Sequence, residues 1–177
     1  MMKIEDLLAA RASAFPAHLR LETDPLSEDD VLQEAQILDV RFAALIGVVG
    51  VLFELRQALQ LQEASTAVLV ARGVRALEWS ADTPSSPHTA WSVIGSTPRV
   101  QTEGVAGGGF GLHLSLHRHG TAHLEAEHCE FYVVDVPGLP SVPPDYTEID
   151  LRHLDGQVAN WDSPCEIVGA SRVSAHQ

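Results

Sequence analysis

Residues 37–57, ILDVRFAALIGVVGVLFELRQ, decide the fold predicted for this chain. β-Branched and aromatic residues dominate the stretch, and Gly47 stands where a two-residue type II′ turn requires a positive φ. The uncharged run, residues 42–53, is shorter than the roughly 20 apolar residues that cross a membrane. A buried helix is disfavoured because each central glycine would cost it about 1 kcal/mol. The stretch therefore predicts a β-hairpin that turns at residues 46–49.

The alternation of side chains predicts the register of this hairpin. Successive strand residues point to opposite faces, so apolar residues should meet apolar residues across the turn, and charges should meet charges. The apolar pairs expected are Val40 with Leu55, Phe42 with Phe53, and Ala44 with Val51. The charged pairs expected on the other face are Asp39 with Arg56 and Arg41 with Glu54. We expect both phenylalanines to be buried neighbours. The charged pairs are interpreted as structural, because exposed ion pairs contribute about 1 kcal/mol or less.

The remaining sequence predicts an α+β fold. It is dominated by an antiparallel sheet of about six strands, with short N-terminal helices and a long irregular C-terminal segment. A single domain is expected for 177 residues. Its parts are a helical arm at residues 1–35, a sheet with one hydrophobic core at 36–136, and a Pro-rich acidic segment at 137–177 that packs on the sheet.

Local signals predict further elements. Helices are expected at residues 4–14 and 27–35, and strands at 66–78, 89–94 and 112–136. Ser27 is a favourable N-cap for the second helix. Trp79 is expected to end its strand against the core, and Pro98 to lie in a turn. The glycine-rich residues 104–111 precede a strand, so a hairpin connection is favoured over a phosphate-binding loop, which needs a following helix.

Charge and cysteine content limit the function classes. The net charge is −13, and acidic residues concentrate near both ends of the chain. Nucleic-acid binding needs a basic surface and is disfavoured, whereas a basic protein partner is compatible with an acidic one. Neither a signal peptide nor a membrane segment is recognisable, and two cysteines suit a reducing cytoplasm. Pairing of Cys129 with Cys165 stays open.

Five of the nine histidines fall between residues 113 and 128. A hairpin that turns at His119–Thr121 would pair His117 with His123, Ser115 with Glu125, and His113 with Glu127. The candidate metal ligands are thus His113, His117, His123, Glu125 and Glu127. Imidazoles on directly opposed strand positions are close enough to share zinc or nickel. The alternative is a solvated polar face, because the spacing matches no known zinc motif.

No catalytic motif stands out, so the leading hypothesis is a non-enzymatic binding or protein-interaction module. In general plan, as a small acidic cytoplasmic α+β domain, the chain is similar to bacterial immunity proteins; the resemblance assigns no residues. One alternative is a metal-binding protein or metal-dependent enzyme that uses the histidine hairpin. Another is a small-ligand binder with a pocket between the sheet and the C-terminal segment. A homodimer is also expected, because Val48 and Leu52 would lie exposed on the outer face of the hairpin.

Overall fold

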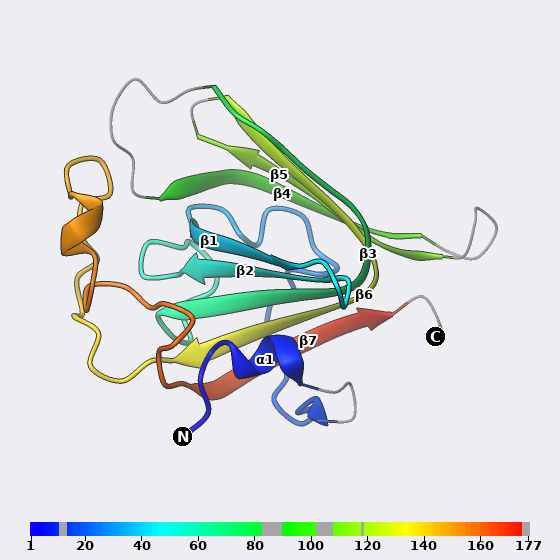
Figure 1. Cartoon of the computed structure of the whole chain (residues 1–177), viewed down its shortest axis with the longest axis horizontal. Helices are drawn as coiled ribbons and strands as arrows, with labels where there is room; N and C mark the ends of the chain where they lie inside the picture. The colour runs from blue at the N-terminus through cyan, green and yellow to red at the C-terminus, as the bar shows by residue number, and fades with distance from the viewer. Residues whose placement is uncertain (11–13, 83–89, 102–107, 118, 175–177) are drawn as a thin grey trace.

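A computed structural model describes residues 1–10, 14–82, 90–101, 108–117 and 119–174 (Figure 1). This part of the chain holds seven strands, one α-helix and a short 3-10 helix. The strands are β1 (Gln36–Ala43), β2 (Val48–Glu54), β3 (Thr66–Ser80), β4 (Trp91–Gln101), β5 (Gly109–Leu116), β6 (Gly120–Asp135) and β7 (Glu166–Ser174). The helix α1 is Asp6–Ala9, and the 3-10 helix is Leu151–His153. The prediction of a mainly antiparallel sheet is confirmed, and its helical content is smaller than expected.

The strands form one sheet that closes on itself. Their order is β3-β2-β1-β4-β5-β6-β7, and an additional β3–β6 pairing joins the first six into a ring. The weakest joint is between β1 and β4, where only Gln36–Ser92 and Ile37–Trp91 are paired. From Leu38 onward, β1 pairs with β2 alone within the described residues. In Figure 1, β4 and β5 form a layer above β1 and β2, and the long strands β3 and β6 curve from one layer to the other.

The paired strands β3 and β6 have two unlike halves. In the covered half, residues 66–71 oppose residues 129–134, and all of them are buried. In the open half, residues 74–80 oppose residues 121–126, and many side chains are exposed. The halves meet near Gly73, whose φ is +63°, and the register shifts between Val74 and Ala76. A glycine and a bulge at this point let the ladder bend.

The covered half has a hydrophobic cluster on each face, so the expectation of a single core is wrong. The cluster inside the ring includes Phe53, Leu69 and Phe131. The cluster outside it includes Val68 and Trp161, and is covered by the two ends of the chain. Because both faces are packed, every residue of β2 is buried.

The β1–β2 hairpin exists, but its predicted register is wrong. Val40 lies opposite Val51 and not Leu55, and Phe42 lies opposite Val49 and not Phe53. A four-residue loop, residues 44–47, therefore replaces the predicted two-residue turn. Gly47 keeps the predicted positive φ, at +63°. The register is displaced by an even number of residues. Residues predicted to share a face of the hairpin therefore still share it, although every predicted cross-strand pair is lost.

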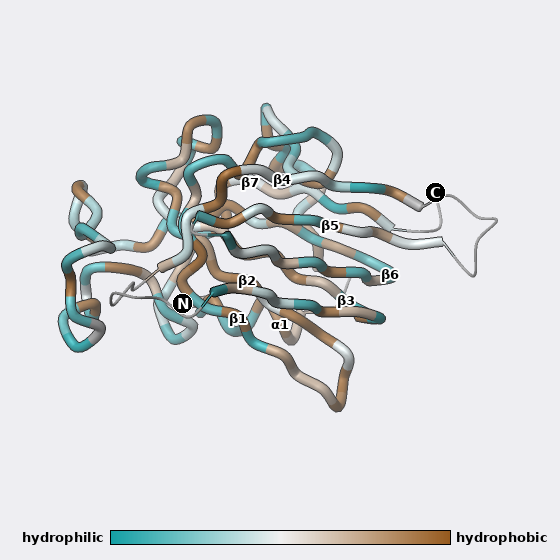
Figure 2. Tube along the Cα trace, turned by 90° about the horizontal axis from the view of Figure 1, so that it is seen from above, coloured by the Kyte–Doolittle hydropathy of each residue, from teal (hydrophilic) through white to brown (hydrophobic). Residues whose placement is uncertain are grey.

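This register changes which hairpin residues are exposed. Phe53 is fully buried against Phe131, whereas Phe42 is 56% exposed beside the exposed loop residues Leu45 and Ile46. Figure 2 shows this hydrophobic loop protruding from the sheet. Val48 and Leu52, expected to be exposed for a homodimer, are buried. The premise of the dimer prediction is therefore wrong, and the dimer itself stays a prediction.

Other local predictions also need correction. Of the helix expected at residues 4–14, residues 11–13 lie outside the described part and residues 4–10 hold only α1. Residues 27–35 form turns in which Asp30 and Glu34 have positive φ. The strand expected at residues 89–94 continues as β4 through Pro98. Proline is tolerated there because the far side of β4 carries no ladder. Residues 83–89, which include the start of that expected strand, lie outside the described residues, as do 102–107 of the glycine-rich connection. The C-terminal segment contributes the further strand β7.

Candidate functional site

The histidine hairpin forms as β5 and β6, but with a register four positions from the predicted one. His123 faces His113 and not His117, with ring centroids 6.3 Å apart. Glu125 lies opposite Gly111, and its carboxylate is 3.1 Å from Nε2 of His123. His117 lies past the end of β5 and is exposed.

The structure therefore brings together only part of the predicted metal set. His113, His123 and Glu125 gather on the outer face, while Glu127 lies against Gly73 at the bend. Among the described residues, no three His, Cys, Asp or Glu side chains converge closely enough to hold an ion. Zinc or nickel binding stays a prediction, and it would rest on the His113–His123 pair.

A second candidate site, which brings together more potential binding groups than the histidine hairpin, lies along the unpaired edge of β1. The Val40 N–H donates to the Asp39 carboxylate at 2.9 Å. Because alternate residues of an antiparallel strand direct their N–H and C=O groups to opposite sides, Val40 and Phe42 present theirs away from β2. The Val40 N–H is already bonded, so the edge of β1 offers the Phe42 N–H and the carbonyls of Val40 and Phe42, where the neighbouring strand β4 has already separated from it.

On the inner side of this edge lies a hollow that we call the tryptophan hollow. It measures about 330 Å³ and is lined by Ile37, Leu38, Asp39, Val40, Leu77, Trp79 and Trp91. Trp79 packs edge-on against Trp91, with ring centroids 5.6 Å apart, yet remains 42% exposed. Large apolar side chains that face a hollow with this much exposure mark a surface suited to an apolar group. The sequence predicted that Trp79 would end its strand against the core, and this prediction is wrong.

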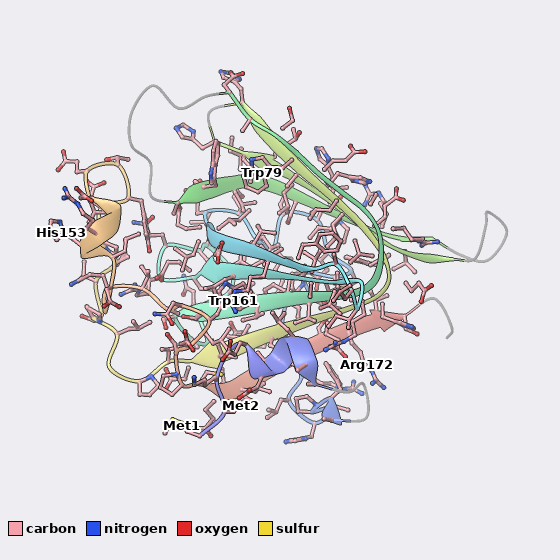
Figure 3. The ribbon with its side chains drawn as sticks, viewed as in Figure 1. Met1, Met2, Trp79, His153, Trp161 and Arg172 are labelled. Atoms are coloured by element: carbon pink, nitrogen blue, oxygen red, sulfur yellow. The ribbon has the colours of Figure 1, made fainter. Side chains whose placement is uncertain are left out.

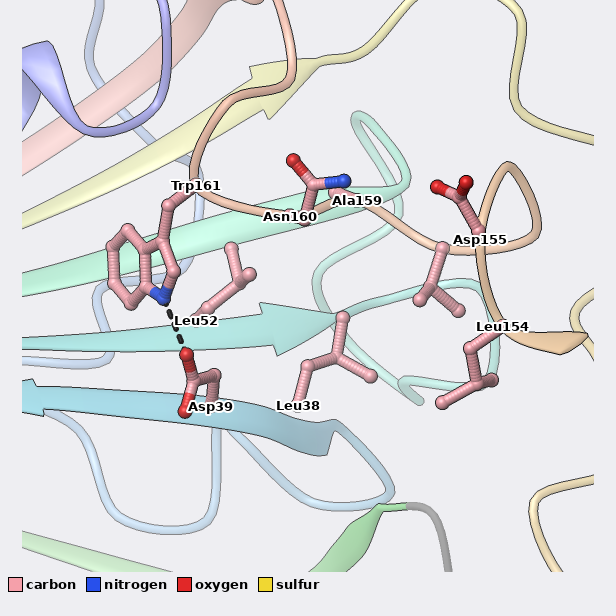
Figure 4. A pocket seen from close by; sticks show the side chains of 9 residues that line it. Leu38, Asp39, Leu52, Leu154, Asp155, Ala159, Asn160 and Trp161 are labelled. Carbon is pink, nitrogen blue, oxygen red and sulfur yellow. Dashed lines mark hydrogen bonds between the residues drawn. The ribbon is translucent and has the colours of Figure 1, made fainter. Parts of the chain in front are cut away.

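On the opposite face of β1 lies a second hollow, the carboxylate hollow, about 280 Å³ in volume (Figure 4). The C-terminal segment forms one wall and the strands β1 and β2 the other. Its lining is Leu38, Asp39, Leu52, Leu154, Asp155, Val158, Ala159, Asn160 and Trp161. The floor is aliphatic, and Asp39, Asp155 and Asn160 supply the polar atoms. In Figure 3, Trp79 lies beside β4 whereas Trp161 lies over β2.

Trp161 fixes the geometry of the carboxylate hollow. Its Nε1–H donates to Asp39 at 2.6 Å, and the Arg41 guanidinium lies 5.0 Å from its ring centroid. The ring fits because the residue below it in β2 is Gly50: a Cβ there would be 2.9 Å from the indole. Each Asp39 oxygen accepts one hydrogen bond, from Val40 or Trp161, and a carboxylate oxygen has capacity for another.

A buried ion pair holds the wall of this hollow in place. Arg56 pairs with Glu54 at 2.6 Å, and their side chains are 7% and 0% exposed. The guanidinium also donates to the carbonyls of Pro140, Val142 and Gln157, which all belong to the C-terminal segment. The hydrogen bonds that Arg56 donates to the Glu54 carboxylate are the main reason that the pKa of Arg56 is raised. The predicted exposed pairs Asp39–Arg56 and Arg41–Glu54 are therefore wrong. The observed Glu54–Arg56 pair is buried, so removing one of its partners is costly.

The two cysteines supply no reactive site. Both are free and buried, Cys129 in the inner cluster and Cys165 in the outer one. Because the sheet lies between these clusters, the disulfide left open by the sequence is not formed. Burial raises the pKa of Cys165 to about 11 and that of Cys129 well above its ordinary value, which keeps both thiols protonated.

Sequence reasoning missed the residues of both hollows. Leu77 and Trp79 alternate on one face at the end of β3, a pattern that could have indicated an apolar face extending past the core. Asp155 and Asn160 belong to an irregular segment, and no local pattern connects them with Asp39. Only the tertiary packing of the C-terminal segment brings these three together.

Comparison of the chain with protein-family models, curated proteins and solved structures gave no match. Within the described residues, no helix has the length and apolar character needed to cross a membrane.

Proposed function

We propose that this protein is a binding module that takes an extended segment of a partner protein as an added strand along the free edge of β1. In strand addition, backbone hydrogen bonds supply affinity, and pockets for alternate side chains supply specificity. The observation that carries the proposal is the pair of hollows on opposite faces of one unpaired edge.

A strand added beside β1 would lie about 4.8 Å from it and direct successive side chains to opposite faces. One set would enter the tryptophan hollow and the other the carboxylate hollow. The two hollows share Leu38 and Asp39, so both are within reach of the same short segment.

A separate small molecule is the second candidate, because the carboxylate hollow lies between the sheet and the C-terminal segment. Its volume of about 280 Å³ is below the range of about 300–1,000 Å³ that is usual for ligand pockets. It also opens onto the backbone edge. Both features favour a side chain that enters from a bound strand over a free ligand.

The test starts from a display library of random peptides of about eight residues selected on the wild-type protein. Enriched peptides are then measured by fluorescence anisotropy against Phe42→Pro and Phe42→Ala. Proline removes the edge-facing N–H, whereas alanine retains it and removes the same exposed ring. We expect binding to fall at least about tenfold with Phe42→Pro and to change little with Phe42→Ala.

A second measurement does not depend on the variant folding. N-methylation is scanned along an enriched peptide, and strand addition predicts losses at alternate positions only, because only alternate N–H groups face β1. Absence of any enriched peptide, or uniform tolerance of N-methylation together with undiminished binding to Phe42→Pro, contradicts the proposal.

A further inference from the structure

We infer that the segment bound along β1 is a basic amphipathic strand, with lysine or arginine side chains in the carboxylate hollow and aliphatic or aromatic side chains in the tryptophan hollow. This inference rests on the proposed function and specifies its partner.

The charges around the carboxylate hollow support a cationic occupant. Asp39 and Asp155 both line it, and Asn160 adds an amide oxygen. Arg41 is the nearby cation, but it lies over the Trp161 ring and is already paired with Glu5 at 3.4 Å. The group as a whole therefore retains negative charge. A lysine or arginine can lay its aliphatic stem on Leu38 and Leu154 while its charged head reaches the carboxylates.

The tryptophan hollow has the opposite character. Leu77, Trp79, Trp91 and Val40 form most of its lining, and among the described residues that line it Asp39 alone is charged. A branched aliphatic or aromatic side chain would bury the exposed part of Trp79 and extend the edge-on contact between the two indoles. A charged side chain would be desolvated there, because the Asp39 carboxylate turns to Trp161 on the opposite face of β1.

The two hollows together impose a spacing. Side chains alternate along a strand, so basic and apolar residues of the partner must occur at neighbouring positions and repeat with period two. The net charge of −13 would also attract such a segment over distance and increase its association rate at low salt.

The test compares two synthetic peptides of about seven residues, one alternating lysine with leucine and one alternating glutamate with leucine. We expect the lysine peptide to bind the wild-type protein at least about tenfold more tightly. The double variant Asp39→Asn/Asp155→Asn should lose most of this preference. Asparagine at position 39 keeps an oxygen that can accept from the Trp161 indole.

A matched control separates local recognition from general attraction. Glu22→Gln/Glu63→Gln removes the same charge from two exposed sites outside both hollows, and it should leave the preference unchanged. Equal loss in both double variants, or equal binding of both peptides, overturns the inference while strand addition still stands. If neither these peptides nor any library peptide binds, the proposed function itself fails.

Discussion

The covered and open halves of the β3–β6 ladder share one hydrogen-bond pattern and differ in what surrounds them. In the covered half, β2 continues the sheet beyond β3 and β7 continues it beyond β6, and a hydrophobic cluster lies on each face. In the open half, β3 has lost β2 as a neighbour, and its inner face presents Leu77 and Trp79 to a hollow. The covered half is therefore packed on both faces, whereas the open half leaves apolar side chains exposed.

The free edge of β1 lies beside exposed apolar surface. Exposed edges favour association, and proteins usually cover or charge them. Here the edge carries Asp39 and Arg41, whose side chains turn toward Trp161. The edge is thus charged on one face and apolar on the other, in agreement with the two hollows beside it.

The largest effect should come from the covered half. Phe53→Ala removes a fully buried ring in contact with Phe131, and should lower the free energy of unfolding by about 3–5 kcal/mol. Phe42→Ala is the matched control, since that ring is more than half exposed, and it should cost under about 1 kcal/mol. Urea denaturation of both variants measures the contrast. Equal costs would mean that the hairpin register described here is wrong.

The buried Glu54–Arg56 pair should rank next. Arg56→Met leaves a fully buried carboxylate without its partner and frees three carbonyls, at a cost of about 3 kcal/mol or more. Glu54→Gln/Arg56→Met should recover part of this loss, because no unpaired charge remains. Denaturant unfolding gives both values. A double variant less stable than the single one would show that the pair is not the source of the cost.

Alkaline pH should test the burial of the covered half and of the C-terminal segment spectroscopically. The chain has two tyrosines, Tyr132 and Tyr146; both are buried, and burial raises the pKa of each above its ordinary value. Below about pH 10 both are protonated in the folded and unfolded states, so folding is unaffected. Above it the unfolded chain ionises first, and stability falls as pH rises. Absorbance near 295 nm should therefore increase only as the protein unfolds, whereas in urea it should increase with a midpoint near 10. Ionisation of either tyrosine while the fold is intact would contradict its burial.

Substitutions in the open half should have little effect on the stability of the fold. Trp79→Ala removes a side chain that is 42% exposed, and should cost about 1 kcal/mol, well below the 3–5 kcal/mol of a core tryptophan. Its main effect should be on binding in the tryptophan hollow. Thermal unfolding monitored by far-UV circular dichroism provides the measurement. A cost comparable to that of Phe53→Ala would place Trp79 in the core and remove the hollow as a binding surface.

The smallest effect concerns the outer face of the open half. Any zinc or nickel binding that calorimetry detects in the wild-type protein should be lost in His113→Ala/His123→Ala and unchanged in His117→Ala, because His113 faces His123. Stability should change little in either variant, since the side chains are exposed or half-buried. Dependence of metal binding on His117 instead would favour the register expected from the sequence.

The sequence by itself determined the two hairpins and which residues of each hairpin strand share a face. In both hairpins the predicted register is displaced by four positions, from Leu55 to Val51 opposite Val40, and from His117 to His113 opposite His123. Side chains alternate with period two, so an even displacement keeps every apolar residue on its face. The alternation of apolar and polar residues therefore hardly distinguishes registers that differ by an even number of residues. The length and conformation of the loop determine which register forms.

Only the tertiary structure decided which surfaces are covered and which stay open. The outer cluster exists because α1 and Trp161, from opposite ends of the chain, pack on the same face of β2 over Gly50. The carboxylate hollow exists because Arg56 holds the C-terminal segment by three carbonyls. These contacts join residues far apart in the sequence: Arg56 and Pro140 are 84 positions apart, and Asp39 and Trp161 are 122. Local alternation and turn chemistry carry no information over that distance, because it is the bend of the sheet and the packing of both chain ends that bring such residues together.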